Sequence, residues 1–207
     1  KKDKKESSNY FAITLHRSGN EIPDFQDKFV KYYQKETNLH IHPTYSKIQK
    51  GKGKDNGDLT QPETIKNFRK EVAKKSKSYA NLVTADGGFV WQDENYQEQE
   101  AYKLILGEIV GALSVQAKGG TFVCKFFECF TDITIKYLKI LQEFYEEVYI
   151  YKPYTSRYSN SERYVVCQGF KLDPDVAFEK ITPLFKILEG MSNLKKEYPI
   201  DIFPQFK

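Results

Sequence analysis

The chain has little of what marks secreted and membrane proteins. No apolar run approaches the roughly 20 residues that a membrane-spanning helix needs. The first five residues, four lysines and an aspartate, lead into polar sequence and not into the apolar stretch of a signal peptide. Cysteines are too few and too unevenly spaced for a disulfide framework, which favours a reducing compartment; the 207 residues contain Cys124, Cys129 and Cys167. A disulfide-rich secreted scaffold is therefore excluded, and a membrane protein is disfavoured.

The chain also lacks a strong charge of either sign. Lys and Arg number 32 against 28 Asp and Glu, which gives a net charge of +4 and an isoelectric point near 8.7. This balance permits a nucleic-acid partner without requiring one, because strongly basic binding domains usually exceed a pI of about 9. With 40% hydrophobic and 29% charged residues, the chain is typical of a globular domain. Composition therefore indicates a soluble intracellular enzyme or binding module.

Apolar runs alternate with segments of helical periodicity along most of the chain. Short apolar runs bounded by turn residues predict strands over residues 10–15, 39–44, 79–84, 121–126, 148–151 and 163–169. Apolar residues at helical spacing predict helices over residues 23–36, from 60 onward, 96–115, 133–147 and from 174 onward. Thr60 and Glu63 form a capping box at the start of the second helix, and Pro183 is expected to kink or break the last one.

This alternation predicts an α/β fold with a mainly parallel sheet covered by helices on both faces. The connection between residues 151 and 163 is too short for a crossover helix, so we expect the last two strands to be antiparallel. No linker divides the chain. We expect a Lys-rich leader at residues 1–9, one domain at 10–171, and a helical extension and tail at 172–207.

Three charged side chains are predicted at one rim of this sheet. Asp86 follows one predicted strand, Lys125 lies at the end of another, and Glu162 precedes the last one. Ligands bind beyond the carboxyl ends of parallel strands. A lysine between two carboxylates can handle protons, because burial lowers its pKa while the carboxylates raise it. The alternative is a buried ion pair that only stabilises the fold.

Other polar residues give weaker signals. Asp58 lies in a turn before a predicted helix, where it could accept a hydrogen bond from an exocyclic amine such as that of adenine. The more common role of such a carboxylate is to favour the helix N-terminus. His40 and His42 have the spacing of two metal ligands on a strand, but no third ligand accompanies them, so no metal site is predicted. Gly107 and Gly111 are expected to allow close packing of their helix on the sheet.

Four blocks of sequence carry a resemblance to a known family. They are Asn56–Ile65, Thr84–Phe89, Gly119–Phe126, and Lys152–Arg157 continuing through Asn160–Gly169. In order and spacing they resemble the FtsJ/RrmJ-like ribose 2′-O-methyltransferases and, within that group, the eukaryotic cap-specific mRNA (nucleoside-2′-O-)-methyltransferases. Residues 10–15 also look like the second strand of this family.

The resemblance implies a Rossmann-like sheet, mostly parallel with an antiparallel last strand, and S-adenosylmethionine as the cofactor. The family uses a Lys-Asp-Lys-Glu tetrad, in which Asp86, Lys125 and Glu162 match the last three members. Asp58 and the backbone of Leu59 match the family's contact with the adenine of the cofactor. Asp86 would also lie near the methionine end of the cofactor.

The implied reaction is methyl transfer to the ribose 2′-OH of the first transcribed nucleotide of capped mRNA, which converts cap 0 to cap 1. Lys125 would accept or polarise the hydroxyl proton, and the reaction requires no metal. Arg157 and Ser161 are expected to contact the RNA backbone. The resemblance implies the nucleus, with the cytoplasm as the alternative. A catalytically inactive RNA-binding or scaffold relative, and an enzyme for the second cap nucleotide, rRNA or tRNA, remain open alternatives.

Two features of the family have no counterpart in this sequence. It contains no Gly-rich loop of the type that cradles the methionine part of the cofactor. The family's first catalytic lysine precedes its first strand, and the leader lysines do not replace it because they form a solvated run. Since the family's first strand lies in the middle of the sheet, an additional N-terminal segment or another chain is expected to complete the fold.

Overall fold

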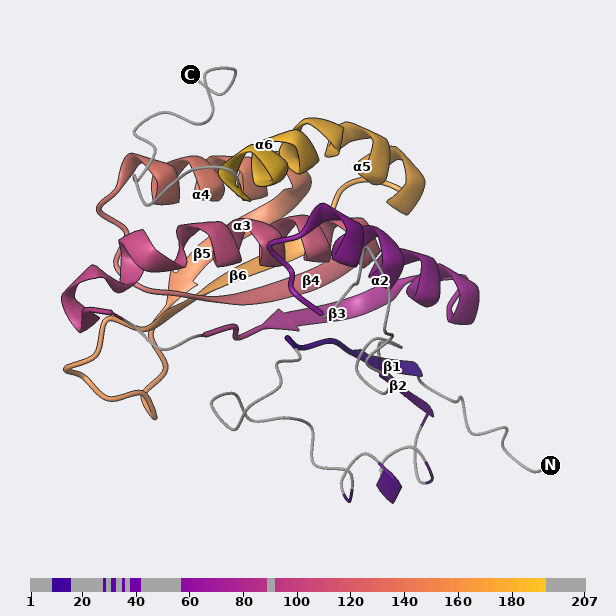
Figure 1. Cartoon of the computed structure of the whole chain (residues 1–207), viewed down its shortest axis with the longest axis horizontal. Coiled ribbons are helices and arrows are strands. Elements are labelled where there is room, and N and C mark those ends of the chain that lie inside the picture. The colour runs from indigo at the N-terminus through magenta and orange to yellow at the C-terminus, as the bar shows by residue number, and fades with distance from the viewer. Residues whose placement is uncertain are drawn as a thin grey trace.

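The computed structural model describes residues 9–15, 28, 31–32, 35, 38–41, 57–88 and 92–192. Strands and helices alternate along this part of the chain (Figure 1). The strands are β1 (Asn9–Ala12), β2 (Asn38–Ile41), β3 (Ala80–Ala85), β4 (Gln116–Phe126), β5 (Tyr145–Tyr151) and β6 (Arg163–Phe170). The helices are α2 (Pro62–Lys75), the short η2 (Glu94–Tyr96), α3 (Gln97–Val115), α4 (Asp132–Phe144), α5 (Pro174–Lys180) and α6 (Thr182–Ser192).

The predicted elements that fall on described residues are present, but several of their ends differ. β4 begins at Gln116 and not at Thr121, and α4 ends at Phe144, where β5 starts three residues before its predicted position. The last helix is broken at Ile181, close to Pro183, as predicted. The predicted helix over residues 23–36 lies largely outside the described residues, as do residues 1–8 of the predicted leader and the tail beyond residue 192.

Four strands form one sheet in the order β3–β4–β6–β5. β3 and β4 are parallel, and β6 lies between β4 and β5 and is antiparallel to both. β3, β4 and β5 therefore point in one direction and the last strand runs against them, which confirms the predicted α/β class and the antiparallel last strand. The short connection from β5 to β6 leaves no room for the helical crossover that a parallel pair needs.

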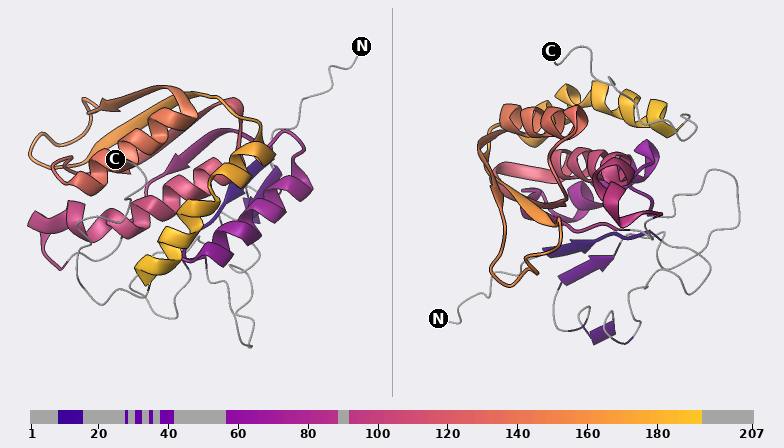
Figure 2. Two further views of the ribbon diagram at one scale, coloured as in Figure 1. Left: turned by 90° about the horizontal axis from the view of Figure 1, so that it is seen from above. Right: turned by 90° about the vertical axis from the view of Figure 1, so that its left-hand side faces the viewer.

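Helices cover one face of this sheet. Figure 2 shows α3, α4, α5 and α6 on the same side of the strands. Phe122, Cys124 and Phe126 alternate along β4 and are fully buried on that side, together with Val165 and Cys167 of β6. Every residue of α3 from 105 to 115 is buried, as expected of a helix at the centre of a core. No helix in the described part of the chain is both long and apolar enough to cross a membrane.

The prediction that helices cover both faces is wrong for residues 57–88 and 92–192. The described helices of these ranges leave the other face open (Figure 2), and Tyr149 and Tyr151 are exposed there while Val123 and Val166 are half-buried. Alternation of buried and exposed residues along β4 and β6 is typical of a sheet that packs on one side only. The prediction relied on the alternation of strands and helices along the chain, which is typical of sheets covered on both faces, and not on the alternation within each strand.

β1 and β2 form a second, two-stranded parallel sheet. In Figure 1 this pair lies next to β3, on the side away from β4. β1 and β3 line a common cavity of about 850 Å³, to which α2 and α3 also contribute. We call this cavity the groove. Leu82 of β3 lines it and is 61% exposed. The sheet is thus interrupted at the position where the resemblance implies the family's first strand.

Candidate active site

Two of the three predicted rim residues form an ion pair at the carboxyl ends of β3 and β4. The two strands are parallel, with Ala85 opposite Cys124. Asp86 follows Ala85 and Lys125 follows Cys124, so the two residues lie side by side at this end of the paired strands. Lys125 Nζ lies 2.5 Å from Asp86 Oδ1, and the lysine side chain is 15% exposed while that of Asp86 is 68% exposed. The pair is thus formed by a largely buried ammonium and an accessible carboxylate.

The space around the ammonium of Lys125 is narrow and partly aromatic. Nζ lies 5.9 Å from the centroid of the Phe127 ring. A Cβ added at Gly88 would lie 4.0 Å from Nζ, in ordinary van der Waals contact. Since position 88 is a glycine, the backbone passes the ammonium without a side chain over it. A reacting group can therefore approach Nζ from this side.

Glu162 reaches the same end of the sheet through Tyr164. The register of β4 and β6 places Tyr164 opposite Lys125. The hydroxyl of Tyr164 donates to Glu162 Oε1 at 3.0 Å, and Asn160 Nδ2 donates to Glu162 Oε2 at 3.1 Å. Burial, followed by the hydrogen bond to Glu162, raises the pKa of Tyr164 to about 12. Among the described residues the ion pair of Lys125 is with Asp86 and not with Glu162, which is instead hydrogen-bonded to Tyr164, the residue opposite Lys125 in the sheet.

A lysine that the sequence analysis did not select holds the loop before Glu162. Lys152 Nζ donates to the backbone oxygens of Asn160, at 3.0 Å, and Glu162, at 2.7 Å. Ser156 Oγ donates to Asn160 Oδ1 at 3.3 Å. The β5–β6 loop is therefore tied at its base. Lys152 and Asn160 lie within the matching sequence blocks, and that was the available signal for them.

The two predicted RNA-contacting residues lie on this loop in different environments. Arg157 is exposed, between Tyr154 and Tyr158, which are 89% and 88% exposed. Ser161 Oγ instead donates to Gln97 Oε1 at 2.8 Å. Arg157 is consequently accessible to a ligand, whereas the Ser161 hydroxyl already has a partner within the protein.

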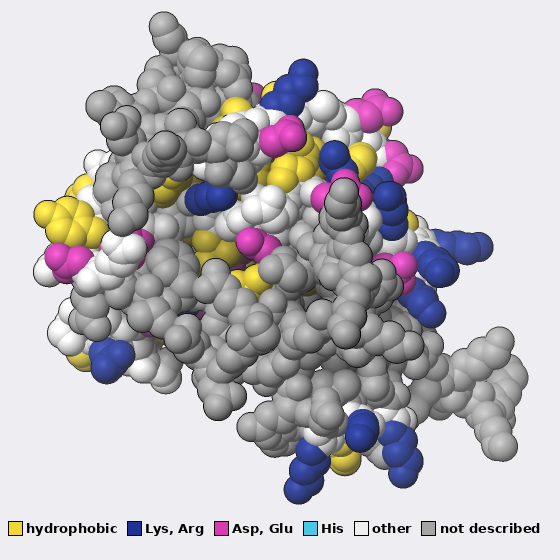
Figure 3. All heavy atoms as spheres, viewed as in Figure 1, with side chains coloured by type: hydrophobic (Ala, Val, Ile, Leu, Met, Phe, Trp, Pro, Cys, Tyr) yellow, Lys and Arg dark blue, Asp and Glu magenta, His cyan; other side chains and the backbone are white. Residues whose placement is uncertain are grey.

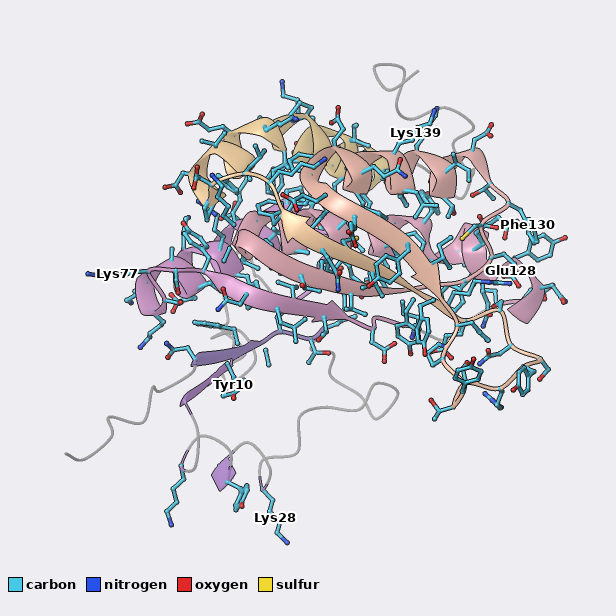
Figure 4. The ribbon with its side chains drawn as sticks, turned by 180° about the vertical axis from the view of Figure 1, so that it is seen from behind. Tyr10, Lys28, Lys77, Glu128, Phe130 and Lys139 are labelled. Carbon is cyan, nitrogen blue, oxygen red and sulfur yellow. The ribbon has the colours of Figure 1, made fainter. Side chains whose placement is uncertain are left out.

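The connections at this end of the sheet lie together. Figure 4 shows Glu128 and Phe130, in the β4–α4 connection, at the same end of the sheet as the β5–β6 loop, while Lys77 lies at the opposite end. Phe130 is 84% exposed. The carboxyl ends of β3, β4 and β5 all point this way, as their common direction requires.

Asp58 serves a turn before α2. Its Oδ1 accepts hydrogen bonds from Thr60 N, at 2.9 Å, and from Thr60 Oγ1, at 2.7 Å. The predicted capping box of Thr60 with Glu63 is wrong, because the Thr60 hydroxyl points to Asp58 and Gln61 occupies the N-cap without a side-chain hydrogen bond. The structure thus shows the turn role of Asp58.

Leu59 is held firmly against α3. A Cβ at Gly107 would lie 2.3 Å from the backbone oxygen of Leu59, whereas one at Gly111 would lie 3.9 Å from a Leu59 methyl group. The predicted close packing is therefore present at Gly107, but against this loop and not against the sheet. Leu59 lines the groove together with Val83 and Ala85 of β3.

The comparison with known families decides the assignment of the chain. Residues 5–170 match the family described as FtsJ-like methyltransferase. The chain belongs to the FtsJ-like methyltransferase family. The match begins before β1 and ends at Phe170, the last residue of β6. α5 and α6 lie beyond it, yet they place Ala177, Ile181 and Leu188 in the same hydrophobic core.

Relatives of this FtsJ-like methyltransferase share one name, cap-specific mRNA (nucleoside-2′-O-)-methyltransferase 1. The relative from Mus musculus is 45% identical over 121 residues, 58% of this chain and 14% of its own length. That from Danio rerio is 42% identical over 125 residues, 59% and 15%. That from Caenorhabditis elegans is 32% identical over 155 residues, 73% and 17%. The chain therefore spans about one seventh of the length of these relatives.

A solved structure also aligns with this family member. It is a ribosomal RNA methyltransferase from Plasmodium falciparum, which covers 64% of each chain with a TM-score of 0.43 and 18% sequence identity. The family assignment rests on the sequence match over residues 5–170.

The histidine pair is not assembled into a metal site in the described part of this methyltransferase. His40 lies in β2, while His42 is outside the described residues. No group of three or more His, Cys, Asp or Glu side chains among the described residues is arranged to hold a metal ion.

Proposed function

We propose that this FtsJ-like methyltransferase transfers a methyl group to the ribose 2′-OH of the first transcribed nucleotide of capped mRNA, converting cap 0 to cap 1. The observation that carries the proposal is the ion pair of Lys125 with Asp86 at the carboxyl ends of β3 and β4. Asp86 and Lys125 lie in two of the four sequence blocks that resemble the family, and the three relatives are named as cap-specific mRNA 2′-O-methyltransferases, which supports the proposal.

The proposed chemistry requires a group that handles one proton. As the new bond forms between the 2′-oxygen and the methyl carbon, the bond from that carbon to sulfur breaks and the hydroxyl proton is released. Lys125 Nζ would accept or polarise this proton, with Asp86 and Glu162 as its positioning carboxylates. The side chain is largely buried, so water competes weakly for it.

We propose S-adenosylmethionine as the methyl donor, since a sulfonium methyl group already carries its leaving group. The cofactor is proposed to bind at the end of the groove next to Asp86, and the rest of the groove is left for the segment proposed below. The groove is lined by Leu59 and by the carboxyl-terminal half of β3, which leads directly to Asp86. These residues fit a nucleoside-containing group. Asp58, beside Leu59, would approach its adenine.

An additional N-terminal segment or another chain would complete the proposed domain at residues 10–171. The groove separates the edges of β1 and β3, both of which line it. An extended segment placed there would join the two sheets and cover Leu82, which is 61% exposed. The separation of the two sheets supports this proposal.

Capped mRNA is the proposed substrate, and Arg157 is the proposed contact to its backbone, with Ser161 as a second. The face seen in Figure 3 carries described Lys and Arg side chains interspersed with Asp and Glu, and Lys and Arg gather over the end of α2. Binding is therefore expected to depend on local contacts near Arg157 more than on a broad positive field. The relatives' cap-directed name supports a nuclear location.

Methyl transfer from tritiated S-adenosylmethionine to capped RNA, with the natural full-length protein, tests the proposal. Label is expected in cap 0 RNA and not in RNA already methylated at the first 2′-oxygen. Lys125→Ala should abolish transfer, whereas Lys118→Ala, on the same strand with an exposed partner in Asp173, should not. If label appeared only in uncapped rRNA or tRNA, that RNA and not capped mRNA would be the substrate. No transfer by the wild type would indicate an inactive RNA-binding relative.

A further inference from the structure

Glu108 is a buried carboxylate that the proposed reaction does not use. It lies on α3, beneath the carboxyl ends of β3 and β4, and is 5% exposed. Its Oε1 accepts a hydrogen bond from the backbone N–H of Gly87 at 2.6 Å. Its Oε2 accepts from the thiol of Cys124, with 3.6 Å between sulfur and oxygen. One carboxylate oxygen therefore has a donor just beyond the end of β3, and the other has a donor within β4.

The two donors are the immediate neighbours of the ion pair. Gly87 follows Asp86, and Cys124 precedes Lys125. The register of β3 with β4 extends to Ala85 opposite Cys124, and residues 86–88 lie beyond the strand. Where the pairing of β3 with β4 stops, the hydrogen bonds of Glu108 to Gly87 and Cys124 connect this end of the two strands to α3.

The packing at this point shows that the arrangement is tight. A Cβ at Gly87 would lie 2.5 Å from Glu108 Oε1, so only glycine fits here while the carboxylate keeps its position. A buried carboxylate is unfavourable unless hydrogen bonds compensate for its lost hydration. Burial raises the pKa of Glu108 to about 7, against the opposing effect of the Gly87 hydrogen bond. An apolar residue at position 108 would avoid this desolvation, yet it would leave the Gly87 amide without this partner.

We propose that Glu108 is a positioning residue, which holds Asp86 beside Lys125 for methyl transfer through the Gly87 amide and Cys124. This inference rests on the proposed function. A displacement of about 1 Å at a reacting centre can lower a rate roughly 100-fold. Glu108 would prevent such a displacement because it holds the backbone of Gly87, after Asp86, and the thiol of Cys124, before Lys125.

The test compares Glu108→Gln with Glu108→Leu in the natural full-length protein. Glutamine retains an oxygen that accepts from Gly87, whereas leucine retains volume alone. We expect the glutamine variant to keep kcat within about 3-fold of the wild type. We expect the leucine variant to lose roughly 10- to 100-fold in kcat, with little change in the KM for capped RNA. Hydrogen exchange and the chemical shift of the Gly87 amide report the contact itself, and the melting temperature reports the fold.

The outcomes distinguish this inference from the proposed function. If the Gly87 amide is unchanged in Glu108→Leu, or if kcat is unchanged after the amide loses protection, the positioning role is overturned. If Glu108→Leu does not fold, Gly87→Ala decides, because its methyl group must displace the carboxylate; wild-type kcat in that variant overturns the role. If the wild type transfers no methyl group, the proposed function fails, and the Gly87 amide still shows whether the contact exists.

Discussion

The two edges of β3 differ sharply in how they are used. Along one edge β3 pairs in register with β4, and this pairing brings Asp86 to Lys125. Along the other edge it borders the groove, across which lies β1. All contacts that form the candidate proton-handling pair lie within residues 57–170. The proposed cofactor site, in contrast, depends on what occupies the groove. Catalytic groups and cofactor binding can therefore be perturbed separately in this fold.

Asp86→Asn is expected to have the largest effect, on the paired edge. The amide keeps the size of the side chain and removes the charge that faces Lys125 Nζ at 2.5 Å. We expect kcat for methyl transfer to fall by about 100- to 1,000-fold, because a correctly oriented acid–base group contributes roughly that much. Steady-state kinetics with capped RNA measures it. Asp173→Asn, which removes an exposed partner of Lys118, is the control and should retain activity. Equal activities of the two variants would show that Asp86 has no role in catalysis.

The buried carboxylate beneath the same edge gives stability a pH dependence. Burial raises the pKa of the Glu108 carboxyl group to about 7, from an ordinary value of 4.5. Between these values the folded state binds more protons than the unfolded state, so this contribution to stability is full below about pH 4.5 and is lost as pH rises towards 7. Over this pH range the unfolding free energy is expected to fall by roughly 3 kcal/mol. Urea unfolding of wild type and Glu108→Gln at several pH values measures it, and the variant should lack this slope; identical slopes would contradict the assignment.

Gly107→Ala and Gly111→Ala form a matched pair beside the groove. On α3 the added methyl group meets the Leu59 backbone oxygen at 2.3 Å in the first variant and a Leu59 methyl group at 3.9 Å in the second. We expect the first to lose about 1–3 kcal/mol of unfolding free energy through overpacking. The second should gain up to about 1 kcal/mol from helix propensity. Thermal or urea unfolding distinguishes them, and an equal gain in stability in both variants would show that Leu59 moves away from the added methyl group.

The smallest effect is expected on the open edge. Leu82 is 61% exposed where it lines the groove, so Leu82→Ser should change the unfolding free energy of this 207-residue chain by about 0.5 kcal/mol or less. Val83, the next residue, packs against the core, and Val83→Ser should cost about 2 kcal/mol. If a segment fills the groove in the full-length protein, Leu82→Ser should become destabilising there. The same small effect in both proteins would argue against such a segment.

Local patterns predicted the positions of strands better than their ends. Gly119 and Gly120 suggested that β4 begins at Thr121, yet the strand starts at Gln116. Gly119 adopts a φ of 75°, and the register with β3 shifts between Ala80 and Leu82. A glycine signals a turn or an irregularity within a strand equally well, and only the partner strand selects between them.

Site residues were predictable where strand order dictated the geometry. Asp86 follows β3 and Lys125 lies near the end of β4, so parallel pairing was enough to bring them together. Glu108 could not be found this way, because it reaches the rim from the middle of α3 across the core. The predicted capping role of Thr60 was wrong because its hydroxyl can bond either to the helix or to Asp58, and in the structure it bonds to Asp58.

The sequence by itself determined the family, the α/β class and the nearness of Asp86 to Lys125, since these follow from motif order and from the common direction of neighbouring strands. Only the tertiary structure decided that the described helices cover one face, that the sheet is interrupted between β1 and β3, and that Glu108 accepts a hydrogen bond from Gly87, the residue after Asp86. The physical reason is one of range. Periodicity and turn chemistry act over a few residues, whereas burial and long-range hydrogen bonds depend on which distant segments meet.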